Sequence, residues 1–143
     1  MNIEIPVSAG ELIDRITILR LKQARIRDRR KLANVNSELA NVEAVCVRTI
    51  GALEAAPSRV RERVAALTEV NRGIWDVEDE LRRLERADDF GPRFTEAARQ
   101  VYRLNDERHR LKRALSEDYG SAILEEKSHA SADSETDPEA DSA

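Results

Sequence analysis

The chain has 143 residues, of which 41% are apolar, 36% are charged and only 3% are aromatic. This size suits one domain, and the composition is typical of a helical protein with an aliphatic core and a charged surface. The apolar runs are too short to cross a bilayer, and the N-terminus lacks the pattern of a secretory signal. A single cysteine excludes an internal disulfide framework, so we expect a cytoplasmic protein.

The net charge of −4 comes from the C-terminal end of the chain. Residues 130–143 contain five acidic and no basic side chains, which leaves the body of the chain with a slight positive charge. This segment is built from small and polar residues and cannot bury apolar surface. We therefore expect a helical domain over residues 1–129 and a disordered acidic tail over residues 130–143.

The chain opens with a short extended arm. Apolar residues alternate with polar or small ones from Ile3 to Val7, as in a strand. Ser8 then begins a capping box, in which the serine side chain accepts from a free helical N–H and Glu11 reaches back. If the segment 121–127 forms a second strand, it is the expected partner of the arm.

Two apolar stripes with helical spacing follow the cap. The first contains Leu12, Ile13, Ile16, Ile18, Leu19 and Ile26. The second contains Leu32, Val35, Leu39, Val42, Cys46, Thr49 and Leu53, in steps of three and four typical of a coiled-coil seam. Because the two stripes do not share a register, we expect a kink or a break in the basic run 27–31.

Two more helices are predicted downstream. Pro57 ends the second helical segment, and Ser58 is positioned to cap a helix that continues to about residue 87. Its stripe contains Val60, Val64, Leu67, Val70, Ile74, Val77, Leu81 and Leu84. The stripe of the last helix contains Phe94, Ala97, Val101, Leu104, Leu111 and Leu115, is interrupted by Arg108, and stops at Tyr119-Gly120.

Short connections between these segments favour antiparallel neighbours. The predicted fold is therefore mainly α: an antiparallel helical bundle or a long helical hairpin of three to four helices, with the N-terminal arm beside it.

The candidate functional residues are polar groups at the edges of the apolar stripes. Three asparagines, Asn34, Asn71 and Asn105, occupy comparable settings on three segments, which predicts a shared polar layer. The full set of candidate ligand-binding residues is Glu11, Asp14, Arg15, Asn34, Asn71, Trp75, Glu78, Tyr102, Asn105 and Lys112. If their faces converge, they form a pocket for a small anionic or sugar ligand.

Each candidate also has a structural explanation. Glu11 is accounted for as part of the cap, and Trp75 as an anchor in an aromatic-poor core. The asparagines can set helix register instead of binding a ligand. The histidines and the cysteine lack the spacing of a metal site, and no motif indicates a cofactor or a nucleophile elbow. The basic run 27–31 has no interleaved aromatic residues, which argues against nucleic-acid binding.

Five segments in this order resemble a family of short bacterial and phage proteins classed as a domain of unknown function. They are Gly10–Leu19, Lys31–Val35, Ile74–Asp79, Val101–Asp106 and Glu125–Ser128. The resemblance covers about residues 3 to 129. The chain has Arg15 where this family usually has Lys, and His129 where Tyr is common. The resemblance brings no established activity, but it places the polar edge residues inside the family signature.

These observations favour a helical interaction or scaffold module that self-associates as a dimer or binds a protein partner. The alternative is a small-molecule-binding protein or a cofactor-free enzyme that uses the inter-helix pocket. In support of this alternative, the segment beginning at Glu11 resembles the first helix of small all-helical chorismate mutases. That resemblance implies a dicarboxylate substrate bound by Arg and Lys without a metal.

Overall fold

The computed structural model describes residues 1–121 and 126–130. Within this part of the chain, the mainly α fold is confirmed and no strand is present. The elements are α1 (Ala9–Arg25), α2 (Arg29–Thr49), the short 3-10 helix η1 (Leu53–Ala55), α3 (Ser58–Arg86) and α4 (Pro92–Asp118).

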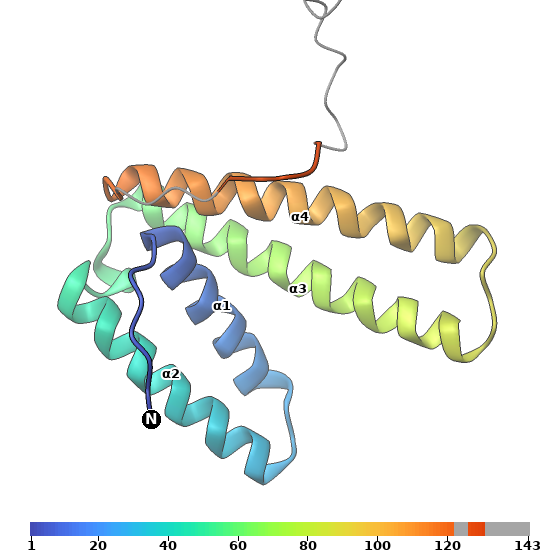
Figure 1. The fold of residues 1–143 in the computed structure, drawn as a ribbon, viewed down its shortest axis with the longest axis horizontal. Helices are drawn as coiled ribbons and strands as arrows, with labels where there is room; N and C mark the ends of the chain where they lie inside the picture. Colours follow the sequence, from blue (N-terminus) through green and yellow to red (C-terminus); the bar gives the residue numbers. More distant parts are fainter. Residues whose placement is uncertain (122–125, 131–143) are drawn as a thin grey trace, which may run out of the picture.

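The four α-helices form two antiparallel hairpins, α1–α2 and α3–α4 (Figure 1). Helix α1 packs against both helices of the second hairpin, whereas α2 packs against α1. The α1–α2 hairpin therefore slopes away from α3–α4 and gives the molecule a V shape (Figure 1). Helix α1 is about 26 Å long and α3 about 44 Å, at 1.5 Å per residue, so α1 covers only part of the longer hairpin.

The helix ends follow local rules. The Ser8 side chain accepts a hydrogen bond from the Glu11 amide at 3.1 Å, which confirms the predicted cap of α1. The helical path is interrupted between α1 and α2. Asp28 caps α2, because its side chain accepts a hydrogen bond from the Lys31 amide at 2.9 Å. The prediction that Ser58 caps α3 is wrong, because α3 begins at Ser58 itself directly after Pro57.

The core is aliphatic and runs through all four helices. Its buried members are Ile13, Ile16, Leu19, Val35, Leu39, Cys46, Leu53, Val60, Leu67, Leu111 and Leu115. Cys46 lies in the predicted α2 seam and is 2% exposed. Burial raises the pKa of its thiol, so Cys46 stays protonated at neutral pH and acts as a small apolar residue.

The N-terminal arm is extended and leaves its large apolar side chains in solvent: Ile3 is 78% and Ile5 is 72% exposed. The predicted strand partner over residues 121–127 falls mostly outside the described residues, as does nearly all of the predicted tail over residues 130–143.

Candidate functional site

A buried polar cluster ties three helices together around Asp14. The side chain of Asp14, from α1, is almost fully buried, and Arg108 of α4 binds it through two hydrogen bonds of 3.1 and 2.6 Å. Asn71 of α3 donates both amide hydrogens, one to Asp14 and one to the Thr17 hydroxyl, each at 2.9 Å. The Thr17 hydroxyl in turn donates to the Asp14 carbonyl oxygen at 2.7 Å.

This arrangement satisfies the buried polar groups internally. The guanidinium of Arg108 compensates the charge of Asp14 in the forked geometry that a carboxylate prefers. Across the described residues, no buried side-chain nitrogen or oxygen lacks a hydrogen-bond partner. The polar groups between these helices are thus bonded to one another within the chain. The Asp14 cluster therefore has a structural role, and it gives the small-ligand alternative no support.

A second contact holds the first turn of α1 against the C-terminal part of α4. The Glu11 carboxylate pairs with the ammonium group of Lys112 at 2.7 Å. The Gly10 amide donates to the Ser116 hydroxyl at 2.9 Å. A Cβ atom at Gly10 would lie 2.0 Å from the Lys112 carbonyl oxygen, so only glycine allows this approach.

The predicted layer of three asparagines is wrong. Only Asn71 is buried. Asn34 is exposed on α2, because Val35 and Leu39 face α1 and Asn34 lies beside that seam on the solvent side. Asn105 is also exposed, and its amide donates to the Val101 carbonyl one turn earlier in α4 at 3.1 Å.

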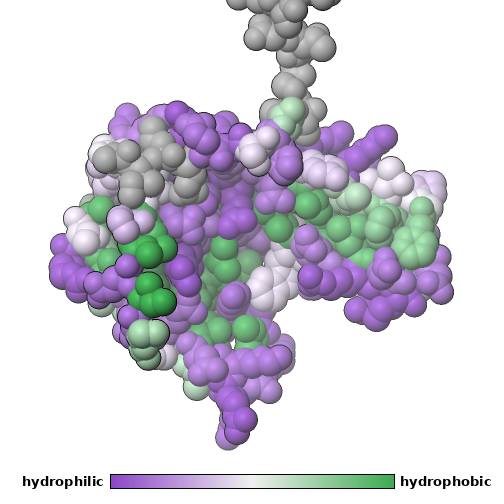
Figure 2. Space-filling view, viewed as in Figure 1, coloured by the Kyte–Doolittle hydropathy of each residue, from purple (hydrophilic) through white to green (hydrophobic). Residues whose placement is uncertain are grey.

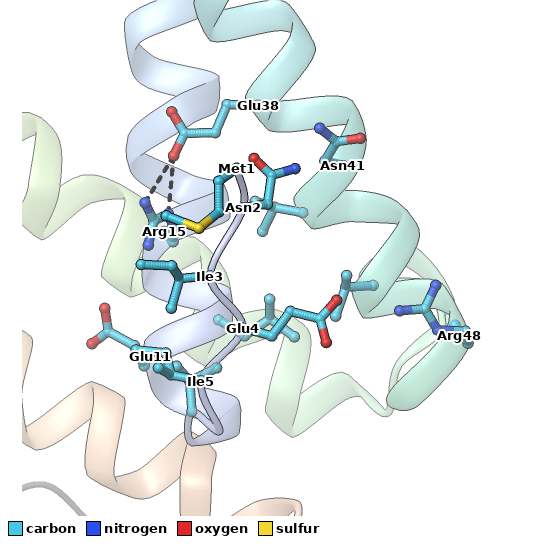
Figure 3. Close-up of a pocket in the computed structure, with 14 residues that line it drawn as sticks. Met1, Asn2, Ile3, Glu4, Ile5, Glu11, Arg15, Glu38, Asn41 and Arg48 are labelled. Carbon is cyan, nitrogen blue, oxygen red and sulfur yellow. Dashed lines mark hydrogen bonds and ion pairs between the residues drawn. The ribbon is translucent and has the colours of Figure 1, made fainter.

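Arg15 lies at an open cavity of about 720 Å³ between the N-terminal arm and the α1–α2 hairpin (Figure 3). Its guanidinium binds Glu38 of α2 at 2.9 Å, so the charge of Arg15 is already compensated by a neighbouring helix. The arm forms one wall of this cavity, yet Ile3 and Ile5 remain mostly in solvent. The cavity is an open groove and does not join the Asp14 cluster.

Trp75, Glu78 and Tyr102 also lie outside the Asp14 cluster. The guanidinium of Arg25, at the end of α1, is 5.5 Å from the centre of the Trp75 ring. Glu78 pairs along its own helix with Arg82 at 3.8 Å. Tyr102 is 68% exposed on α4. The structure thus brings Glu11, Asp14, Asn71 and Lys112 into the two polar contacts that α1 makes with α3 and α4. The other six candidates take no part in these two contacts.

Arg108, Thr17 and Ser116 contribute to these contacts but were not among the predicted site residues. Arg108 did carry a signal, since it interrupts an apolar stripe at a position where α4 meets α1. A charge at such a position indicates a buried partner. Thr17 and Ser116 carried no comparable signal, because a hydroxyl at a helix position is equally common on the surface.

Beyond the end of α1, the α3–α4 hairpin presents a surface of half-buried apolar residues mixed with polar ones, which we call the distal face. Its residues are Ile74, Glu78, Leu81 and Glu85 of α3 and Phe94, Ala98, Val101 and Asn105 of α4. Steps of four and three place each set on one side of its helix. Figure 2 shows the corresponding apolar band along the distal part of the hairpin.

The distal face continues the stripes that α1 covers elsewhere. On α3 the stripe steps from Leu67, which is fully buried, through Asn71 to Ile74 and Leu81, which are half-buried. On α4, Leu115 is fully buried and Val101 is half-buried, while Ala97, on the same side as Leu115, stays buried in the distal half. Beyond the end of α1 the stripe on α3 is therefore less buried and more polar, because Glu78 and Glu85 alternate with Ile74 and Leu81.

A family model matches the whole chain, residues 1–143. The chain belongs to the family of unknown function DUF6165. No curated protein and no solved structure matches it significantly. In this DUF6165 chain, no described helix is long and apolar enough to cross a membrane. The described residues also contain no cluster of three or more His, Cys, Asp or Glu suited to a metal ion.

Proposed function

We propose that this DUF6165 chain is a helical interaction module and that the distal face is its docking surface. Leu84 and Ala97 are buried in the distal half of the hairpin. The observation that carries this proposal is the set of apolar side chains that stay half-buried beyond the end of α1, which includes Ile74, Leu81 and Phe94. A helix that packs on a core is apolar on the packed side only. An apolar side that continues for about three turns beyond its cover is expected to meet another helix.

The distribution of aromatic residues supports the same surface. The chain has five aromatic residues. Phe94 belongs to the distal face, Phe90 lies in the turn before α4 and Tyr102 is exposed on α4. Trp75 lies against Arg25 at the end of α1. The rings of Phe90 and Phe94 pack edge to face at 5.3 Å, and Phe90 is 53% exposed. Aromatic residues anchor protein interfaces more often than other residue types, because each removes a large rigid surface from water.

The buried Asp14 cluster has a supporting role in this proposal. It joins α1, α3 and α4 through directional bonds, and such bonds permit only one relative placement of the helices. The part of the α3–α4 hairpin that packs on α1 is then held in one position, and the distal face extends from it. A rigid surface loses less conformational freedom on binding than a mobile one, so the partner binds more tightly for the same contact area.

The proposal is tested by site-specific photocrosslinking in cells. A photoreactive phenylalanine analogue at Phe94 samples the distal face, and the same analogue at Arg99 samples the opposite, exposed side of α4. We expect one adduct of defined mass from position 94 and none from position 99. The adduct from position 94 should also disappear when Ala98→Arg places a charge within the distal face.

Adducts of equal yield from both positions, or an adduct that survives Ala98→Arg, would contradict a docking role for the distal face. Circular dichroism of each variant controls for misfolding. All variants should retain the helical signal of the unmodified protein.

A further inference from the structure

We propose that the occupant of the distal face is the distal face of a second copy of this chain, so that two α3–α4 hairpins pack antiparallel as a four-helix bundle. This inference rests on the proposed function and names its partner. Each hairpin supplies two adjacent helices: α3 has Ile74 and Leu81 seven residues apart, and α4 has apolar residues in steps of four and three from Phe94 to Val101. Four-helix bundles bury apolar residues at such spacings, and Glu78 and Glu85 lie among them on α3. A two-fold axis that lies in the plane of the contact, perpendicular to the helices, would place each helix of the face against the same helix of the copy.

The charge distribution favours the antiparallel orientation. The end of the α3–α4 hairpin, residues 76–93, holds seven acidic and four basic side chains, a net charge of −3. The α1–α2 turn region, residues 22–31, holds six basic side chains and one acidic one, a net charge of +5. In an antiparallel dimer, the acidic end of each copy lies toward the α1–α2 half of the other copy, where the basic region belongs, although Arg25 and Asp76 already pair within one chain. A parallel dimer would bring two acidic ends together, which is unfavourable.

The size of the face predicts a weak dimer. Helix segments of about 20 Å, lying side by side with a width of about 10 Å each, give a flat footprint of about 400 Å². A stable dimer commonly buries about 800 Å² on each partner. The self-association should therefore depend on concentration, with a dissociation constant on the order of 10 to 100 µM.

Sedimentation velocity of the purified full chain, from about 1 µM to about 1 mM, tests the inference. We expect monomer at the low end and dimer at the high end, with a dissociation constant that rises about tenfold or more in Ala98→Arg. The matched control is Ala65→Arg, the same change at an exposed position on α3 in the part that α1 covers. This control should dimerise like the unmodified protein.

The orientation is tested with Arg29→Glu combined with Arg30→Glu, two exposed positions in the basic region. In the antiparallel dimer this change should weaken association several-fold, and the loss should shrink at high salt because exposed charges are screened. Association that responds to Ala98→Arg but not to this double change would overturn the antiparallel arrangement.

A protein that stays monomeric at the highest concentration would overturn the second-copy inference. The proposed function would then be decided by photocrosslinking alone. If the analogue at position 94 forms an adduct with a different protein, the distal face is still a docking surface. Failure of the inference and failure of the proposed function are thus distinguishable.

Discussion

The two halves of the α3–α4 hairpin carry similar sequence stripes but have different surroundings. In the half that α1 covers, Leu67 and Leu115 are fully buried, and Asn71 and Arg108 bind Asp14. In the distal half, Leu84 and Ala97 are still buried, whereas Leu81, on the side that α1 would cover, is only half-buried. The comparison teaches that an amphipathic helix specifies a side to be covered, whereas the length of the neighbouring helix decides how much of it is covered.

The largest effect is expected when the Asp14 cluster is broken. Asp14→Ala leaves the Arg108 guanidinium and the Asn71 amide without their carboxylate, and we expect the free energy of unfolding to fall by about 3–5 kcal/mol. Urea titration followed by circular dichroism measures this change. The control is Asp76→Ala, which removes an exposed ion pair with Arg25 and should cost less than about 1 kcal/mol. Equal losses in the two variants would contradict the role of the cluster.

The next effect contrasts leucines from the two halves directly. Leu67→Ala creates a cavity under α1 and should cost about 2–5 kcal/mol. Leu81→Ala removes a side chain that is already partly in water, so it should cost clearly less when the protein is dilute. Thermal unfolding at low and high protein concentration gives both values. A Leu81→Ala cost that grows with concentration would indicate that the distal face is covered by association.

A glycine pair tests the close approach of α1 to α4. Gly10→Ala forces a Cβ atom against the backbone of α4 and should destabilise the protein by about 1–3 kcal/mol. Gly73→Ala in the middle of α3 places its Cβ at an ordinary 3.4 Å from Leu104, and the gain in helix propensity should stabilise the protein by about 0.5–1 kcal/mol. The signs of the two changes in melting temperature should therefore be opposite. A neutral Gly10→Ala would show that α1 does not lie as close to α4 as described.

The smallest effect concerns a surface ion network in the distal half. The side-chain hydrogen bond from Arg83 lowers the pKa of Glu80, and Arg93 acts in the same direction. A carboxylate whose pKa is lowered by folding stabilises the protein above its ordinary pKa, and this contribution is lost as the pH falls through the lowered value. Glu80→Gln should therefore reduce the melting temperature slightly at pH 7, and the difference should shrink as the pH falls below the ordinary pKa of a glutamate. A difference that persists in acid would contradict this assignment.

Much of the fold could be predicted from the sequence. The boundaries of α3 and α4 follow from Pro57, the Phe90-Gly91-Pro92 turn and Gly120, because these residues restrict the backbone locally. The cap at Ser8 was predicted from its local motif and the apolar side of α2 from its periodicity, but α2 ends at Thr49, before Leu53 and before the predicted end at Pro57. The candidate site was predicted less well, because a polar residue beside an apolar stripe can face either a neighbour or water.

The asparagines illustrate this limit. Asn34, Asn71 and Asn105 have similar local sequences, yet only Asn71 meets a carboxylate from another helix. The sequence by itself determined the helices, their apolar sides and their ends, since these depend on side-chain periodicity and on local backbone preferences. Only the tertiary structure decided which polar groups are buried and where the α3–α4 stripe becomes uncovered. Both depend on the direction in which α1 crosses the α3–α4 hairpin, which no local pattern encodes.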